Sequence, residues 1–207
     1  MTMRIAVAIS GRGSNLQALL RALQPDAPAE VVLVVTDRAQ APGLSHATSR
    51  NIPAVVLPDP SDAAGWLEPL HDHQVDLIVL AGYLRLVPAP VVAAYRGRIM
   101  NTHPSLLPAF GGKGMYGERV HQAVLDSGAR ETGVTIHLVD EVYDRGAVLA
   151  QSRIPVLRDD TAERLAARVL EVEHRLLPAA VLAAAAAGRP VPLPQSRVES
   201  PESCPGH

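Results

Sequence analysis

The chain has 207 residues, of which 47% are hydrophobic and only 3% aromatic, and this predicts one domain with an aliphatic core. The net charge of −2 and the sequence pI near 6.4 offer no basic surface for nucleic acid. The single cysteine, Cys204, excludes an intrachain disulfide and is typical of a reducing compartment. No apolar stretch reaches the ~20 residues of a membrane span, and the first residues lack a secretory signal pattern. We therefore expect a cytoplasmic protein without a nucleic-acid or membrane partner.

Short apolar runs alternate with helical patterns in the first half of the chain. Continuous apolar runs are typical of strands that are covered on both faces, and they predict strands at residues 5–9, 31–35, 52–57 and 77–81. Apolar residues at helical spacing predict helices at residues 16–23, 43–50, 63–73 and 91–95. Ser61 or Asp62 is placed to cap the third of these helices.

The second half predicts three more strands and two more helices. We expect a strand at residues 99–101 and a helix at residues 116–127. Residues 132–139 alternate apolar and polar side chains, which predicts a half-exposed strand. A strand at residues 147–156 follows a turn-rich loop instead of a helix, so we expect these two strands to pair antiparallel or at an edge. A long helix at residues 161–187 has Thr161 as its cap.

The alternation of strands and helices predicts an α/β fold. We expect a single doubly wound, mostly parallel sheet with an antiparallel edge strand, in one catalytic domain over residues 1–188. After Gly188 the composition changes, because 5 of the 18 prolines lie between Pro190 and Pro205. Residues 189–207 are therefore expected to form a flexible or loosely attached tail.

The first candidate site is the sequence Ser-Gly-Arg-Gly-Ser-Asn at residues 10–15, between the first strand and the first helix. Glycines let a backbone approach a phosphate, and a helix N-terminus supplies free N–H groups and a positive dipole end. The spacing matches neither a dinucleotide fingerprint nor a Walker loop. A mononucleotide-type phosphate is the ligand that we favour over an ordinary tight turn.

The second candidate site follows the fifth strand, where Asn101 and His103 are two residues apart. In an extended strand their side chains point to the same side, so an amide and an imidazole can share one oxygen whose charge develops during a reaction. The alternative is an edge asparagine and a buried histidine with its hydrogen bonds satisfied. Ser105 lacks the Gly-x-Ser-x-Gly pattern of a hydrolase nucleophile, and we expect it to bind local backbone.

The third candidate site is the acidic loop at residues 140–144. A carboxylate from this loop near His103 would raise the pKa of the imidazole. Read alone, the loop is more typical of a solvated acidic turn than of a site. All three candidate sites follow strands, and ligands of parallel sheets collect at the carboxyl ends of the strands. Metal-ligand spacings such as His-x-x-x-His are absent from the sequence, so we expect no metal.

Taken together, these motifs resemble a known family. Four of them occur in order, at residues 9–18 (Ile-Ser-Gly-Arg-Gly-Ser-Asn-Leu-Gln-Ala), 80–85 (Leu-Ala-Gly-Tyr-Leu-Arg), 101–108 (Asn-Thr-His-Pro-Ser-Leu-Leu-Pro) and 139–146 (Val-Asp-Glu-Val-Tyr-Asp-Arg-Gly). With Arg168-Val169 and Glu173-His174, they make residues 4–188 similar to the phosphoribosylglycinamide formyltransferase family. The third motif is shared with other formyl-folate enzymes, and the first motif narrows the choice among these enzymes.

The resemblance implies a Rossmann-like formyltransferase fold and a reaction in de novo purine biosynthesis. In that reaction a formyl group passes from the co-substrate 10-formyltetrahydrofolate to the amine of glycinamide ribonucleotide, without a metal. Small molecules would be the only partners of a monomer or homodimer. Two alternatives stay open, namely another formyl-folate enzyme such as a formyltetrahydrofolate hydrolase, and a non-catalytic module that binds a ribonucleotide phosphate.

The resemblance also implies roles for individual residues. The catalytic residues of the family match Asn101, His103 and Asp144. The residues that bind the ribonucleotide match Gly13, Ser14, Asn15 and Glu173. The residues that line the folate site match Leu84, Arg85, Leu86, Val87, Asn101, Asp140, Glu141, Val142, Tyr143 and Asp144.

The sequence departs from the family pattern at three places. The short acidic loop at residues 58–62 has Asp59 where many members carry an arginine near the folate tail. Leu170 stands where some members have a polar side chain facing the substrate. Lys113 lies in a variant glycine-rich loop at residues 111–114, and its charge suggests a contact with the phosphate.

Overall fold

The computed structural model describes residues 2–198. Its first elements are β1 (Met3–Ile9), α1 (Ser14–Ala22), β2 (Ala29–Thr36), α2 (Leu44–Thr48), β3 (Ala54–Val56), α3 (Ala63–Asp72) and β4 (Leu77–Leu80). They are followed by α4 (Ala89–Ala94), β5 (Ile99–His103), α5 (Glu118–Asp126), β6 (Glu131–Leu138), β7 (Val148–Pro155), α6 (Ala162–Ala187) and β8 (Ser196–Arg197). Every helix and strand predicted from the sequence is present, and β8 is an addition.

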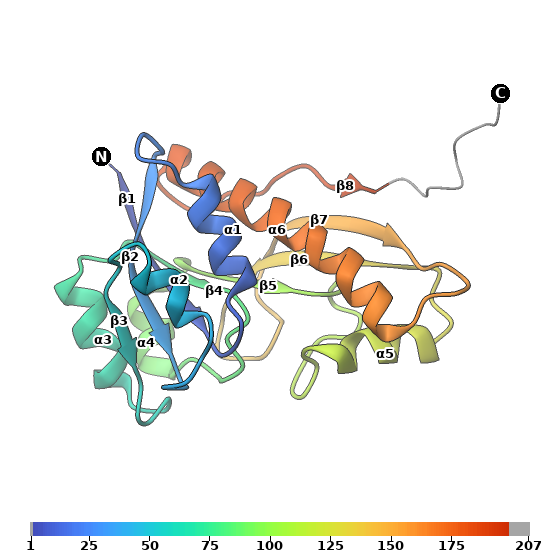
Figure 1. The fold of residues 1–207 in the computed structure, drawn as a ribbon, viewed down its shortest axis with the longest axis horizontal. Coiled ribbons are helices and arrows are strands. Elements are labelled where there is room, and N and C mark those ends of the chain that lie inside the picture. The colour runs from blue at the N-terminus through green and yellow to red at the C-terminus, as the bar shows by residue number, and fades with distance from the viewer. Residues whose placement is uncertain (1, 199–207) are drawn as a thin grey trace.

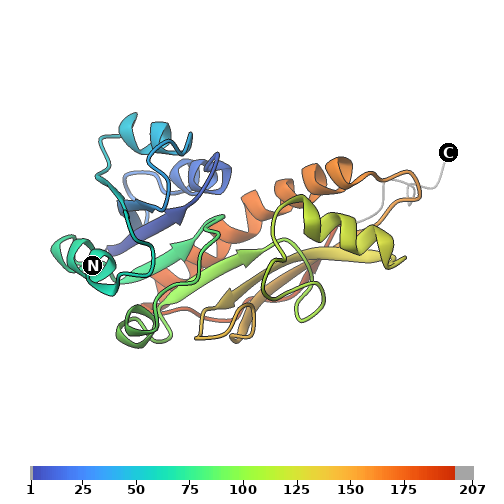
Figure 2. The same ribbon diagram turned by 90° about the horizontal axis from the view of Figure 1, so that it is seen from below.

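The strands form one sheet in the order β3-β2-β1-β4-β5-β6-β7-β8. Helices cover both faces of this sheet, with α1, α2, α5 and α6 on one face and α3 and α4 on the other. Figures 1 and 2 show the sheet and the helices on its two faces from directions at right angles. The prediction of a doubly wound α/β sheet is therefore confirmed.

The two faces explain why the predicted strands are apolar throughout. All five residues from Ile5 to Ile9 in β1 are fully buried, and they alternate between the two hydrophobic clusters. Val7 packs toward α1 and α6, whereas Ala8 packs toward α3 and α4. The clusters are almost wholly aliphatic, and Trp66 is the largest fully buried side chain.

Local signals set the ends of the helices. Asp62 caps α3 by accepting hydrogen bonds from the N–H groups of Ala64 and Gly65, and Thr161 caps α6. Gly188 ends α6 in the left-handed conformation at φ 70°, which glycine adopts without strain. Within residues 2–198, no helix has both the length and the apolar character that crossing a membrane requires.

Strand β6 differs from its prediction in burial and in position. It runs antiparallel to β5 and β7, as expected, but β7 and β8 lie outside it, so it is not at the edge. Six of its eight residues are buried, although the alternating pattern predicted one exposed face. The segment after β5 covers that face, because the Thr135 hydroxyl binds both the carbonyl of Ser105 and the N–H of Leu107.

The first part of the proline-rich tail runs along β7. Leu193 donates a backbone hydrogen bond to Leu149 at 2.7 Å, and Val198 donates one to Arg153 at 2.8 Å. Leu193 and Val198 also pack against the core. We expected a flexible tail over residues 189–207; its residues 189–198 have these contacts, and residues 199–207 lie outside the described part.

The sheet order places the predicted sites together. The strand order reverses between β1 and β4, and in such sheets a crevice opens at the carboxyl ends of the two strands. The loop at residues 10–15 follows β1, residues 82–87 follow β4, and His103 ends β5. These three neighbouring strand ends carry the candidate site.

Candidate active site

The loop at residues 10–15 is packed too tightly for side chains at its glycines. Gly13 has φ +71°, and a Cβ atom at this residue would lie 2.8 Å from the Cα of Gly43. The N–H of Gly43 donates to the carbonyl of Gly11 at 3.0 Å, which draws the start of α2 against the loop. Glycine is therefore required at residue 13 by both backbone conformation and space.

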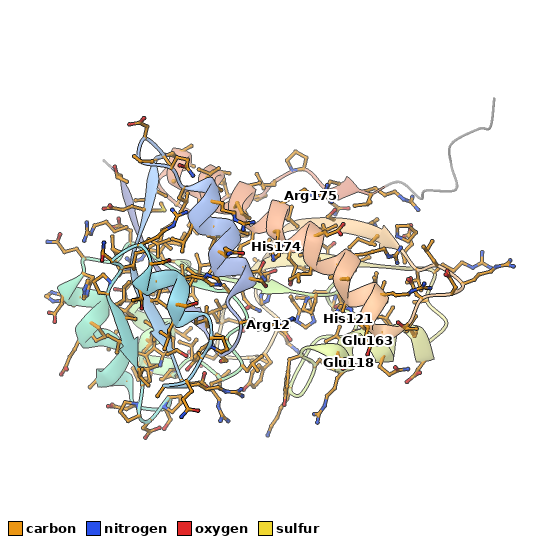
Figure 3. The ribbon with its side chains drawn as sticks, in the orientation of Figure 1. Arg12, Glu118, His121, Glu163, His174 and Arg175 are labelled. Atoms are coloured by element: carbon orange, nitrogen blue, oxygen red, sulfur yellow. The ribbon has the colours of Figure 1, made fainter. Side chains whose placement is uncertain are left out.

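The N-terminus of α1 is free to bind an anion. Among the described residues, no side chain caps this helix, and its first turn holds no acidic residue. Its first N–H groups and the positive end of its dipole are thus open to a ligand. Arg12 is exposed and lies near this helix end (Figure 3), adding a positive charge.

Glu173 of α6 lies beneath this loop and joins it to β5. Its carboxylate accepts hydrogen bonds from Nδ2 of Asn15 at 3.2 Å and from the hydroxyl of Thr102 at 3.3 Å. Burial raises the pKa of Glu173 to about 7, although both hydrogen bonds act in the opposite direction. Oδ1 of Asn15 is buried without a partner in the described chain. The structure thus brings together two of the residues matched to ribonucleotide binding.

The three residues matched to catalysis also converge, and Asp144 lies between two imidazoles. Oδ2 of Asp144 is 3.6 Å from Nδ1 of His103, and its Oδ1 is 3.5 Å from Nε2 of His137. Nδ2 of Asn101 is 3.0 Å from Nε2 of His137. His103, His137 and Asp144 all have nearly buried side chains.

His137 also belongs to this cluster, although no sequence motif indicated it. Its polarity in an alternating strand suggested exposure, but it is 2% exposed and lies directly opposite Asn101 in the β5–β6 pair. Nδ1 of His137 is 2.8 Å from the carbonyl of Leu138, so Nδ1 carries a proton. Nε2 of His137 is the acceptor in the contact with Asn101, because an amide nitrogen only donates. Only the strand register, which the sequence does not state, would have identified this pair.

The glycine segment, residues 110–117, lies against His103 and Asp144. Nε2 of His103 donates to the carbonyl of Phe110 at 2.9 Å, and the N–H of Gly112 donates to Oδ2 of Asp144 at 2.8 Å. Phe110 and Asp144 both have φ +55°, a conformation that is uncommon outside glycine. Because a carbonyl only accepts, Nε2 of His103 holds a proton in either charge state of the ring.

The charges of this site differ from the expectation in one respect. Burial lowers the pKa of His103 and outweighs the nearby Asp144 carboxylate, so the expected rise in this pKa is wrong. Burial would raise the pKa of Asp144, but the neighbouring His137, the hydrogen bond from the N–H of Gly112 and the nearby His103 outweigh it, and the pKa is lowered. At neutral pH the pair is therefore a neutral imidazole beside a carboxylate.

His121 is a second histidine that the sequence analysis did not select. It lies on α5 (Figure 3), is 4% exposed, and has a buried Nδ1 without a partner in the described chain. Burial lowers the pKa of His121 to about 4, and the proximity of His103 adds to this shift. Over residues 2–198, no group of three or more histidine, cysteine or acidic side chains is placed to hold a metal ion.

The residues matched to folate binding form two irregular segments beside the trio. In the 84–87 segment, the N–H of Leu84 donates to the hydroxyl of Ser10 at 3.0 Å. The N–H groups of Arg85, Leu86 and Val87 have no partner among residues 2–198, and Leu86 is 44% exposed. Free N–H groups beside an exposed apolar side chain suit a flat heterocycle with hydrogen-bond acceptors.

The second segment, residues 140–144, has a similar character. Oδ1 of Asp140 accepts a hydrogen bond from the N–H of Val142 at 2.9 Å, which closes a local turn. Val142 and Tyr143 are exposed apolar side chains.

The variant loop at residues 58–62 is held by its own hydrogen bonds. Asp59 accepts hydrogen bonds from both the N–H and the hydroxyl of Ser61, so its carboxylate is engaged locally.

Residues 3–181 match the sequence model of the formyl transferase family. The chain belongs to the formyl transferase family. This match includes the loop at residues 10–15, the cluster of Asn101, His103 and Asp144, and the segments at residues 84–87 and 140–144. The family assignment from the sequence motifs is confirmed.

Individual formyl transferases resemble the chain closely. The chloroplastic phosphoribosylglycinamide formyltransferase of Vigna unguiculata is 46% identical over 180 residues, which cover 84% of this chain and 58% of that protein. The chain thus spans less than two thirds of this relative. Phosphoribosylglycinamide formyltransferase of Haemophilus influenzae is 36% identical, and the match covers 84% of both chains. The crystal structure of the Brucella melitensis enzyme of that name has 46% identity and a TM-score of 0.81, covering 90% of this chain and 97% of that chain.

Proposed function

We propose that this chain transfers a formyl group from 10-formyltetrahydrofolate to the amine of glycinamide ribonucleotide. The observation that carries this proposal is the position of Asp144, within 3.6 Å of His103 and linked through His137 to Asn101. This cluster lies between a free helix N-terminus and a segment with free backbone donors. The relatives that carry the name of this activity support the same reaction.

The ribonucleotide phosphate would bind the N-terminus of α1 at Gly13, Ser14 and Asn15. Arg12 would supply a further positive charge to this phosphate. Glu173 is the acceptor that we assign to the ribose hydroxyls, and it already holds Asn15 in place. From these contacts the substrate amine would extend along β5 toward Asn101 and His103.

The folate would bind between the 84–87 segment and residues 140–144. The free N–H groups of the 84–87 segment would recognise acceptors on its heterocycle, and Leu86, Val142 and Tyr143 would cover its faces. This arrangement brings the formyl carbon to the catalytic trio at the end of β5.

The chemistry needs a donor for the oxygen that becomes negative when the neutral amine attacks the formyl carbon. Asn101 has a second amide N–H free, and the Nε2–H of His103 binds an oxygen in this structure, that of Phe110. The new C–N bond forms as the bond from the formyl carbon to N10 breaks. The Asp144 carboxylate and the neutral His103 would move the amine proton to N10.

An absorbance assay for tetrahydrofolate release tests the proposal. Wild-type protein is mixed with 10-formyltetrahydrofolate with and without glycinamide ribonucleotide, and His103→Ala is measured in parallel. We expect release that requires the ribonucleotide and falls by at least ~100-fold in His103→Ala.

The two alternatives give different results in the same assay. Release of tetrahydrofolate that does not need the ribonucleotide would indicate a formyltetrahydrofolate hydrolase. Ribonucleotide binding without release would indicate a non-catalytic module. Either result contradicts the proposed transfer.

We also propose that the enzyme is cytoplasmic and acts, as a monomer or homodimer, on small molecules alone. The net charge of −2 supports the absence of a nucleic-acid partner. Sedimentation of the purified protein measures its assembly state, and a larger oligomer would contradict this proposal.

A further inference from the structure

A buried carboxylate outside the catalytic trio contacts the 84–87 segment. Asp37 follows β2, and its side chain is only 1% exposed. Its Oδ2 accepts a hydrogen bond from Nε of Arg85 at 3.2 Å, while Nε of Arg38 is farther away, at 3.9 Å. Oδ1 is buried and has no partner in the described chain. A buried charge is stable only when it is compensated, and Arg85 provides the closer compensation.

This ion pair connects the segments that follow β2 and β4. Strands β2 and β4 are not neighbours, because β1 lies between them, so Asp37 and Arg85 meet across the carboxyl end of β1. At that end, Ser10 binds the same stretch of chain, since its N–H donates to Gly82 at 3.1 Å and its hydroxyl accepts from Leu84. The 84–87 segment is therefore anchored at Leu84 by Ser10 and at Arg85 by Asp37.

The core supports the segment from below at Tyr83 and at Val87, which is 3% exposed and lies in the same hydrophobic cluster. Tyr83 packs edge-on against Trp66, with ring centroids 5.3 Å apart. Burial raises the pKa of Tyr83, and the nearby charge of Asp37 adds to this rise. After Tyr83 the chain has no regular structure until α4 begins at Ala89, so its conformation depends on the two polar anchors and on the buried Val87.

We propose that Asp37 is a positioning residue that holds the 84–87 segment through Arg85 in the conformation that binds formyl-folate. This inference rests on the proposed function. Fixing the segment before binding removes the entropy cost of ordering it when the ligand arrives. We expect Asp37 to act on the folate side, because the ion pairs of its carboxylate within residues 2–198 are with Arg38 and Arg85.

Four variants test this inference. Asp37→Asn removes the charge and keeps the shape, and Arg85→Met removes the guanidinium while leaving the backbone donors. Arg38→Met is the matched control, because it removes the other guanidinium near Asp37 from outside the segment. The fourth variant combines Asp37→Asn with Arg85→Met. KM for 10-formyltetrahydrofolate, KM for the ribonucleotide and kcat are measured for each, and calorimetry gives the Kd for tetrahydrofolate.

Asp37→Asn and Arg85→Met are each expected to raise the folate KM and the tetrahydrofolate Kd by about tenfold. The ribonucleotide KM should stay within about twofold, and Arg38→Met should match wild type. The double variant should be no worse than Arg85→Met, because Asp37 acts through that residue. Equal losses for both substrates, additive effects in the double variant, or an Arg38→Met protein as impaired as Arg85→Met would overturn the inference.

The calorimetric measurement separates this inference from the proposed reaction. If wild-type protein binds tetrahydrofolate but transfers no formyl group, the proposed function fails while the role of Asp37 is still tested by the Kd values. If Asp37→Asn does not fold, Arg85→Met alone must show the folate-specific loss. An Arg85→Met protein with a wild-type Kd would then overturn the inference.

Discussion

Nδ2 of Asn101 lies 3.0 Å from Nε2 of His137, the residue directly opposite it in the β5–β6 pair. The imidazole is itself fixed by its bond to the carbonyl of Leu138. The amide of Asn101 therefore has a defined orientation, with one N–H used by His137 and the other available to a substrate oxygen. An oriented donor stabilises developing charge without reorganising during the reaction.

Replacing Asn101 tests this role. Asn101→Ala should lower kcat by about 100- to 1000-fold, the usual loss when one donor to an oxyanion is removed. Ribonucleotide affinity should change little, because the phosphate loop lies elsewhere. Steady-state kinetics and calorimetry give the two quantities, and a kcat within tenfold of wild type would contradict the assignment.

Replacing Asp144 separates charge from shape. Asp144→Asn should lower kcat by about 100-fold or more, because it removes the carboxylate beside His103 while keeping an acceptor for the N–H of Gly112. Ribonucleotide Kd should stay near the wild-type value. Asp159→Asn, which alters an exposed ion pair with Arg164, serves as the control. Equal loss of turnover and binding would argue against an electrostatic role.

Glu173 should make stability depend on pH. Its pKa is raised from 4.5 to about 7 in the folded chain, so folding favours the protonated form. The free energy of unfolding should therefore fall as pH rises from about 4.5 to above 7, by up to ~3 kcal/mol. Urea denaturation of wild type and Glu173→Gln over this range measures the effect. If both proteins have the same pH dependence, the raised pKa is wrong.

A further hypothesis is that Lys113 contacts the phosphate of the ribonucleotide. It is exposed in the glycine segment, next to Gly112, which binds Asp144. If its charge reaches the phosphate, Lys113→Ala should raise the ribonucleotide KM by about three- to tenfold and leave the folate KM unchanged. A Lys113→Ala protein with an unchanged ribonucleotide KM would refute the hypothesis.

Deletion of residues 191–207 should affect stability more than activity. Leu193 and Val198 pack on the core and make backbone hydrogen bonds with β7, so their loss should lower the free energy of unfolding by ~1–3 kcal/mol. Turnover should stay close to wild type, because these contacts are on the far side of β7 from the trio. Denaturant unfolding and kinetics of the truncated chain measure both, and an inactive but folded truncation would refute the expectation.

Much of the fold was predictable because its signals are local. The apolar runs of β1 and β4 match burial on both faces, and Asp62 and Thr161 cap the helices that follow them. β6 was predicted to be half-exposed because polar and apolar residues do alternate along this strand. The residues of its polar face are buried all the same, since the chain after His103 folds back over them.

The candidate site likewise has features that the sequence indicates and features that only the tertiary structure shows. The sequence by itself indicated the candidate residues, because Gly13, Asn101 and His103 lie in short motifs and the family resemblance added Asp144. Only the tertiary structure decided how they act. The strand register places His137 opposite Asn101. Burial lowers the pKa of His103 and so favours the neutral imidazole. The strand order allows Asp37 and Arg85 to pair. These relationships join segments distant in the chain, and their energies come from desolvation and packing, which residue order does not contain.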